Sequence, residues 1–334
     1  MSPDARNRWL GAALLLAALL VLALGAGVGS TGFDSVLRAR HDPVAWQILW
    51  DIRLPRTLGA WTAGALLGLA GAVAQGLFRN PLADPYLLGS ASGAALGVSL
   101  ALALFGTTAA ATQWLMRLGL TGAAFIGAVV GVLLTLMLAR GVQQTLRLLL
   151  AGVIVGVVLG AVRDLVTIAS PDVLQAMQGF MLGNTGFVGW TACGVMAAVL
   201  VVTVLVAVAF GRALDGLALG ESTALSLGLP LVMVRVVLVG ALALATGAAV
   251  AQTGLIAFVG LASPHLVRSL VKTTHDRLLA LSAGMGGLLL MAADVLARWV
   301  IAPQELPVGV LTAVLGGSYL LYLMHRRTSG GGLS

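Results

Sequence analysis

Charged residues are scarce in this chain. Only 9% of its 334 residues are Asp, Glu, Lys or Arg, whereas a soluble domain carries about 25%. Apolar residues make up 59% of the chain, and the mean hydropathy is +1.03. In water, most long stretches of this sequence would expose apolar side chains. The shortage of charge therefore excludes a water-soluble globular protein and indicates a protein embedded in lipid.

Several kinds of chemistry are also missing. The single cysteine, Cys193, excludes a disulfide framework within the chain and a multi-cysteine metal site. The four histidines lack metal-ligand spacing. No G-x-x-x-x-G-K-[ST] loop, HExxH or GxSxG sequence occurs, so we expect neither an enzyme nor a bound cofactor or metal. The arginines form no basic stripe, which argues against a nucleic-acid partner.

Long apolar segments dominate what remains. Ten of them approach the 20 or so residues that a transmembrane helix needs, and the 44 glycines favour close helix packing. The sequence therefore predicts an all-α, polytopic membrane protein with one transmembrane domain over residues 1–334. The expected spans are Trp9–Val28, Thr57–Phe78, Leu87–Gly106, Leu118–Ala139, Leu146–Ile168, Trp190–Phe210, Leu231–Val250, Leu255–Val271, Leu278–Trp299 and Leu306–Met324.

The distribution of arginine predicts the orientation. An even number of spans places both termini on one side, and cytoplasmic termini put most of the 19 basic residues in cytoplasmic segments. We therefore expect a multi-pass protein of the bacterial inner membrane with both termini inside. The longer connections, 30–52 and 169–189, then lie outside, and the longest inside connection is 211–230.

A short sequence pattern recurs in the two halves. Ala72–Gln75 followed by Leu82–Pro85 is matched by Ala249–Gln252 followed by Leu261–Pro264. Because five crossings separate the second span from the seventh, the two halves would run in opposite directions across the membrane. Inverted repeats of this kind are a transporter architecture.

The inside connection has the pattern of a docking segment. Leucines flank an acidic residue in a short amphipathic stretch, and glycines stand where helices can end or turn. Two short helices here could insert into a groove on a cytoplasmic ATPase; a plain solvent-exposed connection is the alternative. The residues concerned are Leu219, Gly220, Glu221, Ser222, Leu225, Leu227 and Gly228.

Motifs along nearly the whole chain resemble those of a known family. Arg53-Leu-Pro-Arg56, Arg79-Asn-Pro-Leu-Ala-Asp-Pro85 and Phe258-Val-Gly-Leu-Ala-Ser-Pro-His265 are similar to motifs of the iron-siderophore, haem and vitamin B12 permeases of ABC importers. The resemblance runs from about residue 53 to 327. The chain departs from the family pattern at Gly183-Asn184-Thr185 and at Gly316-Gly317-Ser318-Tyr319.

The resemblance implies partners at both membrane faces. It implies a homodimer of ten-span subunits that binds two copies of a separate, ATP-using ABC ATPase inside and a periplasmic solute-binding protein outside. By the same resemblance, Arg53, Arg56 and Arg298 would meet acidic residues of the binding protein. Arginines at the outer face also run against the positive-inside rule unless an acidic partner visits. Interfacial snorkelling is the alternative for Arg53 and Arg56, and Arg298 can pair with Asp294 at i,i+4.

The resemblance also places a cytoplasmic gate. Asn80 and Leu82 match gate positions, and Gln144, Thr145 and Leu146 fall in the matching connection between the fourth and fifth spans. Ordinary turns are the alternative, because Asn-Pro and Asp-Pro dipeptides initiate turns in any case.

Arg163, in a span that lines the pathway in the resembling family, bears on the cargo. It could attract a carboxylate-bearing solute, or it could pair with a neighbour. We therefore predict the permease subunit of an importer for haem, which is flat, apolar and anionic, or for a related bulky iron chelate. Vitamin B12 and ferric siderophores remain alternatives within the family. An ion-coupled secondary transporter is the alternative from another class, because it too could use inverted repeats.

Overall fold

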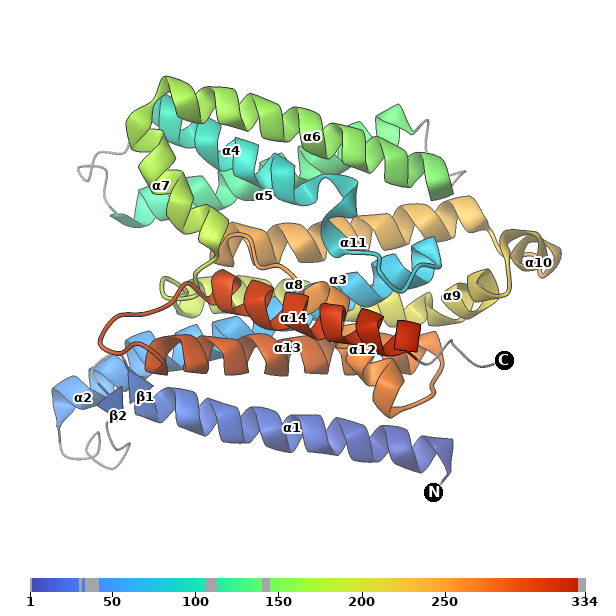
Figure 1. Cartoon of the computed structure of the whole chain (residues 1–334), viewed down its shortest axis with the longest axis horizontal. Coiled ribbons are helices and arrows are strands. Elements are labelled where there is room, and N and C mark those ends of the chain that lie inside the picture. Colours follow the sequence, from blue (N-terminus) through green and yellow to red (C-terminus); the bar gives the residue numbers. More distant parts are fainter. Residues whose placement is uncertain (1, 30–31, 34–41, 106–112, 140–144, 330–334) are drawn as a thin grey trace.

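The fold is a bundle of long α-helices. The computed structural model describes residues 2–29, 32–33, 42–105, 113–139 and 145–329. The long helices run roughly along one axis (Figure 1). They are α1 (Pro3–Gly27), α3 (Leu54–Phe78), α4 (Ser90–Phe105), α5 (Gln113–Leu138), α6 (Thr145–Ala169), α8 (Trp190–Ala209), α11 (Leu231–Thr253), α13 (His275–Trp299) and α14 (Val308–Ser329).

The membrane-spanning character is confirmed, with an approximate count of ten. Within the described residues, seven helices are long and apolar enough to cross a membrane, and α4 and the first part of α14 are shorter apolar helices. The predicted span at Leu255–Val271 is only partly helical, because α12 covers Val259–Leu270. Twelve residues rise about 18 Å, less than the roughly 30 Å of a hydrocarbon core. Left-handed backbone at Gly254 and Phe258 delays the start of this helix.

The connections at one end contain elements that the apolar pattern did not reveal. The connection predicted at 169–189 contains α7 (Pro171–Leu182), which begins with proline at its first turn and ends at Gly183 with a positive φ. The connection predicted at 30–52 contains α2 (Pro43–Ile48) and the single π-helical turn η2 (Leu49–Arg53). A minimal hairpin pairs β1 (Val28–Gly29) with β2 (Gly32–Phe33).

The two ends of the bundle carry different elements. We call the end with α2, η2 and α7 the outer end (Figure 1). The other, inner end holds the start of α1, the last turn of α14 and the short helices α9 (Gly211–Ala218) and α10 (Glu221–Ser226). Exposed tryptophans lie near both: Trp9 in α1, and Trp46 and Trp50 in a cluster with Trp190. Such residues are typical of membrane interfaces.

Helix α3 is the centre of the bundle. Nearly every residue from Pro55 to Phe78 is buried, and α3 packs against α13, α11, α12 and α8. A Cβ atom on Gly64 would lie 2.2 Å from the carbonyl oxygen of Gly286. The same atom on Gly68 would lie 2.3 Å from the carbonyl oxygen of Ser282. Glycine is therefore required where α3 and α13 touch, as expected for helices that associate through close backbone contact.

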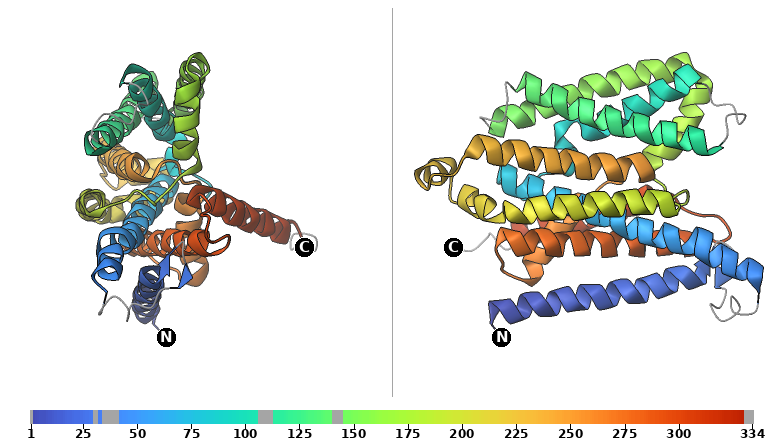
Figure 2. Two further views of the ribbon diagram at one scale, coloured as in Figure 1. Left: turned by 90° about the vertical axis from the view of Figure 1, so that its left-hand side faces the viewer. Right: turned by 180° about the vertical axis from the view of Figure 1, so that it is seen from behind.

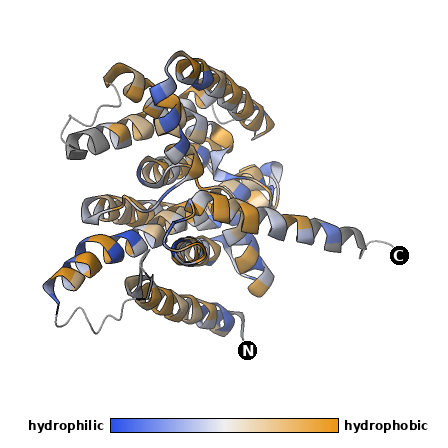
Figure 3. Cartoon of the chain, turned by 60° about the vertical axis from the view of Figure 1, so that its left-hand side comes forward, coloured by the Kyte–Doolittle hydropathy of each residue, from blue (hydrophilic) through white to orange (hydrophobic). Residues whose placement is uncertain are grey.

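The central helices have opposite directions. Helix α3 runs from the outer to the inner end, whereas α11, packed against it, runs from the inner to the outer end (Figure 1). This is the antiparallel relation that the recurring sequence pattern predicts. Helix α14 stands away from the bundle (left view of Figure 2). Long stretches of the helices consist of hydrophobic residues, drawn in orange in Figure 3.

Candidate functional site

The outer end contains a buried ionic network between α3 and α13. Arg56 Nε donates to Asp294 Oδ1 (3.1 Å), and Arg56 Nη1 donates to Glu305 Oε2 (2.8 Å). Arg298 forms an ion pair with the other Asp294 oxygen and donates to Thr57 Oγ1 (2.9 Å). Asp294 is 0%, Arg298 1% and Arg56 8% exposed. The three charges are therefore held inside the protein, where pairing offsets the cost of removing them from water.

Two further groups tie separate segments into this network. Thr185 Oγ1 donates to Asp294 Oδ1 (2.5 Å), which attaches the connection between α7 and α8. Arg298 Nη1 donates to the carbonyl oxygen of Gly25 (3.2 Å), which attaches the end of α1. Sequence spacing alone shows the Asp294–Arg298 pair, which is confirmed, but gives no signal that Thr185 meets it. The network around Asp294 thus joins α3, α13, the connection between α7 and α8, and the end of α1 at the outer end.

The arginines expected at the outer surface differ in their placement. Arg56 and Arg298 are buried and directed to Asp294. The physical reason is that Asp294 would otherwise be a buried, uncompensated charge. Arg53 is half-buried, and its Nη1 donates to the carbonyl oxygens of Ala26 (3.4 Å) and Gly27 (3.3 Å). Of the three arginines, Arg53 is the most exposed to solvent.

The inner end presents two short helices with exposed leucines. Gly220 has φ +114° and separates α9 from α10, and Gly228, with φ +75°, follows α10. Leu219, Leu225 and Leu227 are 67%, 61% and 63% exposed. The opposite side of α9 is buried in the bundle. The segment therefore carries an apolar patch on solvent-facing turns, and Ser222 is exposed beside it.

Glu221 faces the protein more than the solvent. Its Oε1 accepts a hydrogen bond from Arg235 Nη2 in α11 (2.5 Å) and lies 3.9 Å from Arg79 Nη2 after the end of α3. Asp215 of α9 is similarly joined to His275 of α13 (2.6 Å). Side-chain contacts thus attach α9 to α13 and α10 to α11.

The residues matched to a gate lie at the inner end. Asn80 Oδ1 accepts a hydrogen bond from the backbone N–H of Leu82 (2.9 Å), so the turn expected from Asn-Pro is present. Leu82 and Leu146 are exposed. Gln144 lies outside the described residues, and of Thr145 only the helical backbone is described. The residues Asn80, Leu82 and Leu146 are accessible at this end.

The turn after α3 is anchored by buried polar groups. Arg268 of α12 donates to Gln75 Oε1 (2.6 Å), while Gln75 Nε2 donates to the carbonyl oxygen of Leu261 (3.2 Å). Burial raises the pKa of Asp84, and the hydrogen bond that its carboxylate accepts from Tyr86 N–H (2.8 Å) opposes this rise. These contacts connect the turn with the start of the short helix η3 (Pro85–Leu88) and with α12.

Arg163 lies in a cavity between α6 and α7. Its guanidinium pairs with Asp164 (Nη2 to Oδ1, 2.6 Å), and its Nη1 lies 3.5 Å from the Met181 sulfur. The cavity has a volume of about 440 Å³, and Met177, Gln178 and Leu182 also line it. Pairing with a neighbour is therefore observed. The cavity offers a guanidinium, an amide and thioether groups together.

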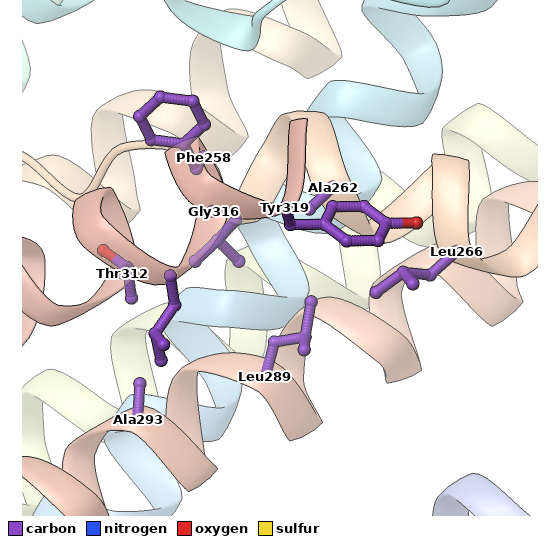
Figure 4. A pocket seen from close by; sticks show the side chains of 10 residues that line it. Phe258, Ala262, Leu266, Leu289, Ala293, Thr312, Gly316 and Tyr319 are labelled. Atoms are coloured by element: carbon purple, nitrogen blue, oxygen red, sulfur yellow. The ribbon is translucent and has the colours of Figure 1, made fainter. Parts of the chain in front are cut away.

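A second, apolar cavity of about 230 Å³ lies between α12, α13 and α14 (Figure 4). Its larger lining residues are Phe258, Leu266, Leu289 and Tyr319. A Cβ atom on Gly316 would lie 2.4 Å from the Phe258 Cβ. Glycine at this position thus allows α14 to approach Phe258. No group of three or more potential metal ligands occurs in the described parts of the chain.

The bundle is apolar, its central helices α3 and α11 run antiparallel, and ionic contacts lie at both of its ends. Halves of opposite direction are a feature of many transporter folds. Residues 14–326 match the FecCD transport family. The chain belongs to this family and is the permease subunit of an ABC importer.

Individual proteins match over nearly their full length. The chain is 38% identical to the hemin transport system permease protein HmuU of Yersinia pestis, covering 94% of each chain. It is 39% identical to the vitamin B12 import system permease protein BtuC of Escherichia coli, covering 95% of this chain and 94% of that protein. A structure described as a metal-chelate type ABC transporter, in an inward-facing conformation, superimposes with a TM-score of 0.84 at 26% identity. The match covers 94% of this chain and 98% of that one.

Proposed function

We propose that this permease carries haem, or a related bulky iron chelate, across the bacterial inner membrane. The observation that carries the proposal is the guanidinium of Arg163 in the cavity between α6 and α7, in a chain similar end to end to a hemin permease. Haem is flat, largely apolar and carries two carboxylates, so a mainly apolar wall suits it if a haem carboxylate takes the place of Asp164 beside Arg163. The similarity to a vitamin B12 permease supports a corrinoid as the alternative.

The energy for transport comes from a separate protein in this proposal. Two copies of an ABC ATPase bind the inner ends of a homodimer of this chain, and a periplasmic solute-binding protein docks at the outer ends. Both chain termini are cytoplasmic. The exposed leucines of α9 and α10 support ATPase docking, because apolar side chains on a turn suit a groove on a partner. The exposed apolar residues of α14, such as Val314, Leu321 and Tyr322, suit contact with a second copy.

Movements of the ATPase reach the gate through charged contacts in this proposal. A shift of α10 acts on α11 through the Glu221–Arg235 pair (2.5 Å) and on the turn before Asn80 through Arg79 (3.9 Å). Asn80, Leu82, Gln144, Thr145 and Leu146 then open and reclose the inner end. These ion pairs depend on short distances, so a displacement of α10 by a few ångströms is enough to break or re-form them.

Docking of the binding protein involves Arg53 first. Arg53 is half-buried, and its Nη1 donates to two backbone carbonyl oxygens; an acidic group of the binding protein would form stronger, charge-assisted bonds with it. Arg56 becomes available when a carboxylate of the binding protein replaces Glu305, whose side chain is 32% exposed. While Arg56 exchanges Glu305 for a carboxylate of the binding protein, Arg298 stays paired with Asp294 and neutralises its charge.

The test of this function is ATP hydrolysis by the reconstituted complex. We expect liposomes containing this chain and its ATPase to hydrolyse ATP faster when a haem-loaded binding protein is added. Cobalamin-loaded and ferric-siderophore-loaded binding proteins serve as matched comparisons. Stimulation by the cobalamin-loaded protein alone would replace haem by a corrinoid. Uptake by the chain alone, abolished by an ionophore, would indicate an ion-coupled transporter and contradict the proposal.

Arg163 gives a sharper test of the cargo. We expect Arg163→Gln to raise the apparent KM for haem transport about fivefold, as the loss of one partly solvated charge-assisted contact would. Asp164→Asn should act in the opposite direction, because it removes the carboxylate that now occupies Arg163. Haem dimethyl ester, which lacks the carboxylates, should respond to neither substitution. Equal effects on haem and its ester would contradict a role of Arg163 in binding the carboxylates.

A further inference from the structure

A second candidate binding site lies at the inner end, between α1 and α13. A cavity of about 510 Å³ separates the first turns of these helices and is lined by Asp4, Asn7, Arg8, Arg277, Ala280 and Leu281. The transport pathway and the docking segments do not use these residues. The inference requires only that the chain lies in a membrane, and it is independent of the cargo.

The two helices are parallel, so both of their N-termini meet this cavity. Gly11 lies opposite Leu281, and Gly284 lies opposite Leu14 farther along the pair. Each N-terminus carries a partial positive charge from its unpaired N–H groups. Asp4 and Asp276 stand in the first turns and offset part of this charge. The N-terminal ends of α1 and α13 therefore attract an anion only where basic side chains add positive charge to them.

Basic side chains are present. Arg277 is paired with Asp4, but Arg8 is exposed and has no ion pair within the described residues. Lys272 and Arg6 are exposed close by in the sequence. The cavity thus has one guanidinium that is ion-paired with Asp4 and a second, that of Arg8, which is attracted by the same carboxylate but makes no ion pair with it.

Asn7 provides an independent indication of a ligand. Its side chain lines the cavity and is only 7% exposed, and its Nδ2 donates to Thr273 Oγ1 (3.0 Å). Its Oδ1 is buried and has no hydrogen-bond partner among the described residues. If the amide turns by 180°, Oδ1 accepts from the Thr273 hydroxyl and the NH₂ group takes the place of the unpaired oxygen. A buried amide left with an unmet hydrogen bond favours a bound polar group.

The surroundings select the kind of ligand. Ala280 and Leu281 form an apolar wall, and Leu15 and Leu16 are exposed farther along α1. Trp9, 68% exposed, stands next to Arg8 as an interfacial residue does. A ligand here needs an anionic head beside Arg8 and an apolar body along α1. Basic pockets between transmembrane helices near the membrane surface bind lipid phosphate groups in this way.

We propose that the cavity between α1 and α13 binds the phosphodiester of an anionic phospholipid. Arg8 and the Asn7 amide contact the phosphate, Arg277 lies beside it, and the acyl chains follow α1. Helix α1 is attached to the bundle mainly through α13. A lipid in this position joins the first turns of the two helices and holds α1 against the bundle.

The experiment is lipid titration of the purified full-length chain in detergent, followed by native mass spectrometry. Phosphatidylglycerol is the probe, and phosphatidylcholine, which has the same phosphodiester but no net charge, is the comparison. We expect phosphatidylglycerol to be retained in preference. Arg8→Gln should weaken its binding about fivefold, whereas Arg8→Lys should retain it. The matched control is Arg6→Gln, since Arg6 is exposed on the same helix but does not line the cavity.

A second variant keeps the test valid if Arg8→Gln does not fold. Asn7→Asp can still accept a hydrogen bond from Thr273 but brings a negative charge to the cavity, so it should also reject phosphatidylglycerol. Equal losses in the Arg6 and Arg8 variants would overturn the proposal, as would equal binding of the two lipids. Displacement of phosphatidylglycerol by millimolar inorganic phosphate would assign the site to a free phosphate and overturn the lipid assignment.

Discussion

Asp294→Ala should destabilise the protein more than any other single substitution in the outer network. The change leaves Arg56 and Arg298 inside the bundle without the carboxylate they share. Removing one partner of a buried ion pair costs about 3–5 kcal/mol, because the remaining charge stays desolvated. We expect a marked fall in the thermal unfolding midpoint in detergent micelles and a lower yield of folded protein.

Two matched variants separate charge from packing. Asp294→Asn keeps the shape and a hydrogen-bond acceptor, so it should lose less stability than alanine does. Adding Arg298→Gln to Asp294→Asn should cost less than the sum of the two single changes, since neither charge is then left alone; Arg56 still has Glu305 at 2.8 Å. Wild-type stability for Asp294→Ala, or strict additivity in this cycle, would show that the network does not hold the outer end together.

The apolar periodicity of the chain predicts most of the fold. A continuous apolar run of about 20 residues indicates a helix in lipid, because a helix pairs all of its backbone groups within the segment. The predicted span at Thr57–Phe78 therefore coincides with α3 to within three residues at its start. The predicted span at Leu255–Val271 fails, because apolar composition does not show where left-handed residues such as Gly254 and Phe258 interrupt the helix. Helix α7 is missed since its 12 residues, which begin at Pro171, are too few to be recognised as a span.

The candidate sites are less predictable than the fold. The i,i+4 spacing of Asp294 and Arg298 is visible in the sequence, and their pair is found. The convergence of Arg56, Thr185 and Glu305 on the same region depends on how α3, α7 and α13 pack, which no local pattern records. The direction of a charged side chain is similarly undetermined: Glu221 stands in an amphipathic segment expected to face a partner, yet Arg235 draws it inward.

Because Glu221 points inward to Arg235, Leu225 is a better residue than Glu221 for testing ATPase docking. Glu221→Gln would weaken an internal pair with Arg235, so a loss of transport would not distinguish docking from folding. Leu225 is 61% exposed, and substitutions at such positions usually change stability by about 0.5 kcal/mol or less. Leu225→Glu should therefore leave the chain folded. If Leu225 fills an apolar groove on the ATPase, burying a carboxylate there should cost about 2 kcal/mol or more, a roughly thirtyfold loss of affinity.

We accordingly expect Leu225→Glu to abolish most haem-stimulated ATP hydrolysis and co-purification of the ATPase, while the elution volume and thermal midpoint of the isolated chain stay unchanged. Leu225→Met is the control, because it preserves an apolar side chain of similar size and should retain both. Leu227, exposed to the same extent beyond the end of α10, should behave like Leu225 when changed to glutamate. Full stimulation in both glutamate variants would mean that the ATPase binds elsewhere. The inner turns would then be solvent-exposed connections, and the path from Glu221 to Arg79 would have no role in driving the gate.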